Sequence, residues 1–207
     1  MKLPSILRSP PPLVAIEIAA SRVTAVAVSG RGAGVKLDAW AVEPLPEGAV
    51  VPSLTAPNVI RPADAEHAVR AALGRLGQRP KRVALALPDA AAKVTLVRFK
   101  EVPARAADLE ELVKFQIRKA APFRVEDSQV TFAAGDRSAE GQEFVVVQAR
   151  RDIVAEYEQV CQAAGATAGV VDLATFGLAQ CALSTAAGLT GDWLLIHGSA
   201  DGATIAI

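Results

Sequence analysis

The side chains that could do chemistry are few in this sequence, and they stand apart from one another. His67 falls in a predicted helix, away from any group of Cys, Asp or Glu residues, and Cys161 and Cys181 lack the close spacing of a metal site. The glycine-rich run at residues 30–34 has phosphate-loop composition, but it joins two predicted strands and no helix follows it. We therefore expect no metal site, a surface or half-buried His67, buried reduced thiols and an ordinary hairpin.

The overall composition limits which binding partners and which cellular compartment are expected. The chain has 207 residues, enough for a substantial core, and its 22 Lys and Arg residues balance 22 Asp and Glu residues. Without a long run of one sign, nucleic acid is not an expected partner. Residues 1–12 are rich in proline and lack the apolar core of a signal peptide, so we expect a flexible leader and a cytoplasmic protein. Residues 173–191 are uncharged but hold several polar and glycine residues, which predicts a packed helix rather than a membrane span.

The spacing of apolar residues predicts an α/β protein. Strands at residues 13–19, 23–28 and 35–42 open the chain as an antiparallel meander, and a helix runs from Pro62 to Gly77. The remaining strands are expected at 83–87, 94–99, 130–133, 144–149, 167–171, 193–196 and 204–207, and the remaining helices at 107–120, 153–165 and 173–183. The helix at 107–120 and its neighbouring strands should share a core made of Leu96, Leu109, Leu112, Val113, Ile117 and Val146.

Residues 82–132 carry the most specific signal in the chain. The positions that carry this signal are Leu87-Pro88, Arg98, Val102-Pro103, Glu111, Val113, the helix through Lys119, Pro122-Phe123 and Glu126-Asp127. The stretch resembles the PilM family, actin-like scaffold proteins of type IV pilus assembly that are related to FtsA. The resemblance implies half of an actin-like, ribonuclease-H-type ATPase fold carrying an inserted strand-helix-strand-strand (SHS2-like) module. We expect the core at residues 13–81 and 167–207 and the module at 82–166.

The resemblance also places a nucleotide site, and the residues there depart from the family pattern. The family grips ATP phosphates with a turn close to Asp-Ile-Gly-Ser-Ser-x-Val-Lys, where residues 17–24 of this chain read Glu-Ile-Ala-Ala-Ser-Arg-Val-Thr. Alanine adds a side chain where the backbone should approach phosphate, and threonine replaces the lysine. The second turn, near Val-Asp-Ile-Gly in the family, is Leu-Ile-His-Gly at 195–198, without a carboxylate for magnesium. The degenerate site would comprise Glu17, Ala19, Ala20, Ser21, Thr24 and Gly198.

A partner-binding role follows from the same resemblance. With its phosphate turns altered, the chain is expected to lack ATPase activity and to bind ATP and magnesium weakly at most. PilM-like proteins bind the cytoplasmic tail of the membrane protein PilN in a groove between the actin-like core and the module. We expect such a scaffold at the cytoplasmic face of the inner membrane, contacting other pilus assembly proteins and reaching the membrane only through partners. Candidate groove residues are Val97, Phe99, Leu112, Phe115 and Phe123; Phe115 is favoured because it falls off the main apolar stripe of its helix, whereas Leu112 suits an ordinary core.

Two other classes of protein stay open at this stage. The cytoplasmic domain of a type II secretion L protein or an FtsA-like division protein would share the fold, although the segment KFQIRKAAPF at 114–123 favours the PilM family. A catalytic actin-fold ATPase or kinase would need intact phosphate turns and a second half.

Overall fold

The computed structural model describes residues 10–30, 34–77, 79–185, 193–199 and 202–206. The chain divides into two compact units. The core unit comprises Met1–Val51, Val59–Pro88 and Tyr157–Ile207, and the module comprises Pro52–Asn58 and Asp89–Glu156. Most of the predicted leader, residues 1–9, lies outside the described residues.

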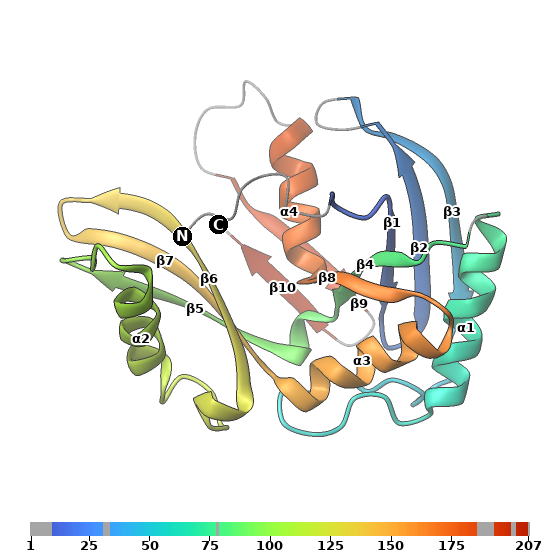
Figure 1. Cartoon of the computed structure of the whole chain (residues 1–207), viewed down its shortest axis with the longest axis horizontal. Coiled ribbons are helices and arrows are strands. Elements are labelled where there is room, and N and C mark those ends of the chain that lie inside the picture. Colours follow the sequence, from blue (N-terminus) through green and yellow to red (C-terminus); the bar gives the residue numbers. More distant parts are fainter. Residues whose placement is uncertain (1–9, 31–33, 78, 186–192, 200–201, 207) are drawn as a thin grey trace. The chain divides into compact units, whose positions relative to one another are not determined.

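The core unit is built on a five-stranded sheet with the order β3-β2-β1-β4-β8 (Figure 1). Its strands are β1 (Val14–Ile18), β2 (Arg22–Ser29), β3 (Lys36–Pro44), β4 (Arg82–Leu87) and β8 (Thr167–Leu173). The first three strands pair antiparallel and form the predicted meander. The strand β4 lies parallel to both β1 and β8. The predicted module boundary at residue 82 is therefore wrong, because β4 belongs to the core sheet and the module begins after it.

One face of this sheet packs against α1 (Pro62–Arg75). Pro62 occupies the first turn, where its missing amide donor costs no helical hydrogen bond. The apolar side chains of α1 recur at helical spacing, and the buried ones are Ala65, Ala68, Val69, Ala72 and Leu73. On the sheet, alternate residues of β1 are fully buried, including Ile16 and Ile18. His67 lies on the exposed side of α1, as predicted.

Two further helices contribute residues to the core unit. The helix α3 (Arg151–Ala163) ends before Gly165, whose φ of +94° suits a glycine after a helix. Only the part of α3 from Tyr157 onward belongs to the core unit, so the predicted module end at residue 166 is also wrong. The helix α4 (Ala174–Thr185) contacts β4, β8 and β9. No helix within the described residues is long and apolar enough to span a membrane.

The two cysteines differ in environment. Cys161 is buried on α3, and this burial raises the pKa of its thiol to about 12. Cys181 is exposed on α4, so the prediction of two buried thiols is wrong for Cys181. The helix α4 buries only its first turn at Ala174 and Thr175, and its later apolar residues Leu178 and Leu183 face outward.

The last two strands form a sheet of their own. The strand β9 (Leu195–Ser199) pairs antiparallel with β10 (Gly202–Ala206), and neither joins the five-stranded sheet. Their two isoleucines, Ile196 and Ile205, are each 63% exposed. The residues that were expected to form the second phosphate turn therefore belong to a separate hairpin.

The module has the predicted order of strand, helix, strand, strand. It comprises β5 (Ala92–Phe99), α2 (Ala106–Ile117), β6 (Ser128–Ser138) and β7 (Gly141–Arg150), with two short 3-10 helices, η3 (Asp89–Ala91) and η4 (Val125–Asp127). The sheet is antiparallel with the order β5-β7-β6, and α2 packs on one face of it (Figure 1). The segment Pro52–Asn58 belongs to this unit, and the Asn58 amide donates to Glu156 Oε2 at 2.7 Å.

The module core lies between α2 and the sheet. Its buried residues are Val97, Phe99, Val113, Ile117, Val125, Phe144 and Val146, with Leu109 and Leu112 partly buried against them. The prediction that Leu96 belongs to this core is wrong, because Leu96 is 61% exposed. Successive side chains of a strand point to opposite faces, so the burial of Val97 and Phe99 places Leu96 on the face away from α2.

Candidate functional site

The first phosphate turn of the sequence analysis is a tight hairpin between β1 and β2. Glu17 and Thr24 are paired opposite one another across the two strands. The Ala19 amide donates to the Arg22 carbonyl at 2.9 Å, and the Ser21 carbonyl accepts from the Leu45 amide at 2.8 Å. Because the Ala19 amide is committed within the hairpin, it is not free to donate to a phosphate oxygen.

The residues of the second phosphate turn lie in the strand β9. Gly198 pairs with Ala203 in the β9–β10 hairpin, which is separate from the sheet that carries Glu17. The His197 ring nitrogen Nδ1 lies 2.8 Å from Thr175 Oγ1 at the buried start of α4. Asp201, the remaining carboxylate near this turn, lies outside the described residues. Within the described part of the chain, no three His, Cys, Asp or Glu side chains come together in a way that could hold a metal ion.

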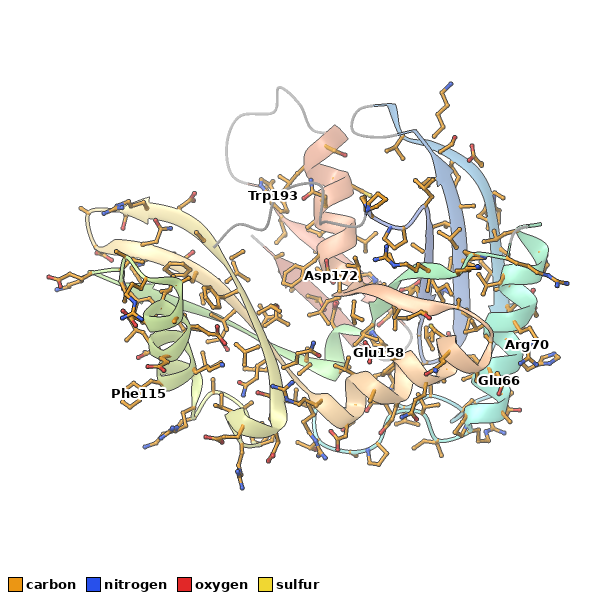
Figure 2. All side chains as sticks on the ribbon, in the orientation of Figure 1. Glu66, Arg70, Phe115, Glu158, Asp172 and Trp193 are labelled. Carbon is orange, nitrogen blue, oxygen red and sulfur yellow. The ribbon has the colours of Figure 1, made fainter. Side chains whose placement is uncertain are left out.

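Two of the predicted partner-binding residues line one groove of the module. Leu112 and Phe115 lie along a groove of about 840 Å³ bounded by α2, η4 and the first residues of β6. Leu112 is half-buried, whereas the Phe115 side chain is 69% exposed on the outer side of α2 (Figure 2). An aromatic side chain this exposed is unusual for a residue whose only role is core packing.

The other three candidates lie elsewhere in the module. Phe123 is half-buried and lines a second hollow of about 570 Å³, surrounded by charged residues that include Arg150 and Asp152. Val97 and Phe99 are 6% and 8% exposed in the module core. Their apolar character is explained by core packing, so neither is available at the module surface.

The face of the module sheet away from α2 carries apolar residues that the sequence analysis missed. We call it the open face and define it by Val94, Leu96, Val145 and Val147. Val94 pairs with Val147 and Leu96 pairs with Val145, so the four side chains form two adjacent cross-strand pairs. Val94 and Leu96 are 41% and 61% exposed, and Val145 and Val147 are half-buried. The sequence does carry a signal for this face, because apolar residues fall on both sides of β5 and β7.

An ion-pair cluster closes one end of the open face. Arg98 lies directly opposite Glu143, with Nη2 3.0 Å from Glu143 Oε2 and Nη1 2.6 Å from Glu140 Oε2. The hydrogen bond to Glu143 raises the pKa of the Arg98 guanidinium. The open face is thus an apolar strip with a fixed charged pair at one end.

These features define the class of protein. An antiparallel meander followed by two parallel strands, interrupted by a strand-helix-strand-strand module, is the α/β architecture of the actin-like class. The model of the family described as "Type IV pilus assembly protein PilM" matches residues 15–192, and the chain belongs to that family.

Solved structures agree with this assignment. A chain from the structure described as the "PilM-PilN type IV pilus biogenesis complex" is 25% identical, with a TM-score of 0.75, covering 88% of this chain and 54% of that chain. The cytoplasmic domain of EpsL, an inner membrane component of the type II secretion system of Vibrio cholerae, shares the fold at 13% identity and a TM-score of 0.51, covering 77% of this chain and 56% of that one. The chain spans a little over half the length of each.

Proposed function

We propose that this protein is a non-catalytic scaffold of type IV pilus assembly that binds the cytoplasmic tail of a PilN-like inner-membrane protein. The observation that carries the proposal is the similarity to a chain of a PilM–PilN complex over 88% of this sequence. The scaffold would act in the cytoplasm and reach the inner membrane through that partner. The altered phosphate turns support a role in binding rather than in ATP hydrolysis.

We further propose that the tail lies along the open face of the module. In an extended conformation, the tail would place alternate apolar side chains on a flat apolar strip. The open face offers such a strip in the two pairs Val94–Val147 and Leu96–Val145. The charged pair of Arg98 and Glu143 beside it supplies a polar contact that would fix the register of the tail.

Replacing Leu96 by glutamate is expected to weaken tail binding by about tenfold or more, because it puts a charge at the centre of the apolar strip. The measurement is calorimetric titration with a synthetic peptide of the cytoplasmic tail of the PilN-like protein. Since Leu96 is 61% exposed, the melting temperature of the variant should stay close to that of the wild type. Phe115→Glu, on the other side of the module sheet, is the matched control. The sequence analysis favoured Phe115 as a tail contact, whereas a tail on the open face predicts that this variant binds the tail normally. Equal binding by wild type and Leu96→Glu would contradict the placement on the open face.

ATP with magnesium is expected to give no saturable binding at millimolar concentration in the same calorimeter. The Ala19 amide is committed to Arg22, and the turn at 195–198 has no carboxylate to hold magnesium. Glu17→Ala, which removes the one carboxylate of the first turn, should leave tail binding unchanged. Tight ATP binding together with no tail binding would overturn the scaffold proposal in favour of an actin-fold ATPase.

A further inference from the structure

A second surface of the module, on the side of α2, is not used by the proposed tail site. Among the described residues, the strand β6 pairs with β7 alone and forms one edge of the module sheet. An edge strand presents a row of backbone donors and acceptors that another extended chain can pair with. The groove of about 840 Å³ follows this edge, since Ser128, Gln129 and Val130 at the start of β6 line it together with α2.

The middle of this groove is apolar. Phe115 extends from α2 with 69% of its surface exposed, and Leu112, three positions earlier, lines the groove with it. Val130 from β6 lines the groove beside them and is itself only partly buried. A large apolar side chain placed here would cover Phe115 and remove apolar surface from water.

The charged residues of the groove are separated by sign along α2. Acidic Asp108 and Glu111 lie toward the start of the helix, whereas basic Arg118 follows its last turn and Arg151 lines the groove with it. Glu126 of η4 also lines the groove, beside Arg118. The ion pairs Arg105–Asp108 at 3.8 Å, Lys114–Glu110 at 2.5 Å and Arg118–Glu126 at 3.9 Å are all exposed and therefore weak, so these charges stay accessible to a partner. Asp108, Glu111, Leu112, Phe115 and Arg118 recur at spacings of three and four on the side of α2 that lines the groove, and Glu110 and Lys114 lie beside them.

The chain path fixes how these charges run relative to β6. The chain leaves the last turn of α2, passes through η4 and enters β6 at Ser128, and Arg118 lies 3.9 Å from Glu126 of η4. The basic end of the groove is therefore beside the start of β6, and the acidic end lies farther along the strand. A strand added antiparallel to β6, the more frequent pairing, would begin at the acidic end and finish at the basic end.

We propose that this groove binds an extended segment of a second protein by adding it as an antiparallel strand to the edge of β6. The segment carries a basic residue that faces Asp108 and Glu111, then a large apolar residue against Phe115, then an acidic residue that faces Arg118 and Arg151. Asp108 and Arg118 are ten positions apart, or about 15 Å along the helix, which an extended chain spans in about four to five residues. This site is distinct from the open face and does not depend on the proposed tail binding.

A second copy of this chain fits the groove poorly. The β6 segment of a copy would bring Arg124, Glu126 and Asp127 first, with a net negative charge, and Asp136 and Arg137 last, whose charges cancel. Paired antiparallel, the net negative start would face the acidic end of the groove, and the neutral end would offer no net negative charge to the basic end. The charge order therefore favours a different protein as the occupant.

The probe is a capped peptide, Thr-Lys-Val-Leu-Val-Glu-Thr, in which the charged and leucine side chains share one face of an extended strand. Calorimetric titration of the full chain is expected to give a dissociation constant on the order of 100 µM. The charge-reversed peptide Thr-Glu-Val-Leu-Val-Lys-Thr, of identical composition, should bind about fivefold more weakly or worse. Phe115→Glu should weaken binding of the first peptide by about tenfold, whereas Leu96→Glu should leave it unchanged.

Exchanging the groove charges should invert the preference between the two peptides, a result that misfolding of the variant would not produce. In the double variant Glu111→Arg with Arg118→Glu, the preference should invert, so that the charge-reversed peptide binds more tightly than the first. Equal affinity for both peptides in the wild type, or no binding of either at millimolar concentration, would overturn the proposal. A wild-type dimer that Phe115→Glu dissociates would assign the groove to a second copy instead. Loss of tail binding alone, with both peptide results intact, would count only against the proposed function.

Discussion

Replacing Phe144 by alanine is expected to destabilise the module by about 3–5 kcal/mol, the range for deleting a buried phenylalanine side chain. Phe144 is 4% exposed at the centre of the module core. Its ring lies 5.8 Å from that of Phe99 and 6.0 Å from that of Phe132, both at tilted angles that favour aromatic contacts. The truncation leaves a cavity between all three strands, because these rings come from β7, β5 and β6.

Urea unfolding followed by circular dichroism measures this loss, and Leu96→Ala is the matched control. Leu96 is an apolar residue of the same sheet, but it lies on the open face at 61% exposure, so its truncation should cost less than about 1 kcal/mol. Losses of similar size for the two variants would mean that the faces of the module sheet are assigned wrongly. They would also remove the basis for placing a partner on the open face.

The secondary structure was largely predictable because its signals are local. Alternating apolar residues in β1 and β2, and the apolar stripe of α1, depend only on neighbours in sequence. The module boundaries were wrong at both ends because they depend on pairings between distant residues. The strand β4 is continuous in sequence with the module, but it pairs with β1 and β8, and the sequence near residue 82 does not record that pairing.

The partner-binding residues were partly predictable for a related reason. Phe115 departs from the apolar stripe of a helix, so its exposure could be inferred from the period alone. In β5 the residues Val94 to Val97 include apolar side chains on both faces of the strand. The alternation of apolar and polar residues therefore does not show which face packs against α2. The sequence analysis accordingly exchanged Leu96 with Val97, placing the exposed residue in the core and the buried one at the surface.

Gly141 should tolerate no side chain, and Gly141→Ala is expected to cost on the order of 2–4 kcal/mol. Gly141 opens β7 with a φ of +134°, a conformation that residues with a Cβ rarely adopt. A Cβ built there would lie 2.4 Å from the Phe99 carbonyl oxygen and 2.8 Å from its carbonyl carbon. Both are backbone atoms of the neighbouring strand β5, so relief requires the end of β5 to move away from β7.

Gly135→Ala provides the control in the same hairpin. A Cβ at Gly135 would meet Glu143 at 3.7 Å, an ordinary van der Waals distance, and Gly135 does not have a positive φ. Its substitution should therefore change the free energy of unfolding by less than about 0.5 kcal/mol in the same urea titration. If Gly141→Ala were as mild as Gly135→Ala, the close approach of β5 to the start of β7 could not be correct. The register that sets Leu96 opposite Val145 would then have to be revised, and with it the strip of apolar pairs on the open face.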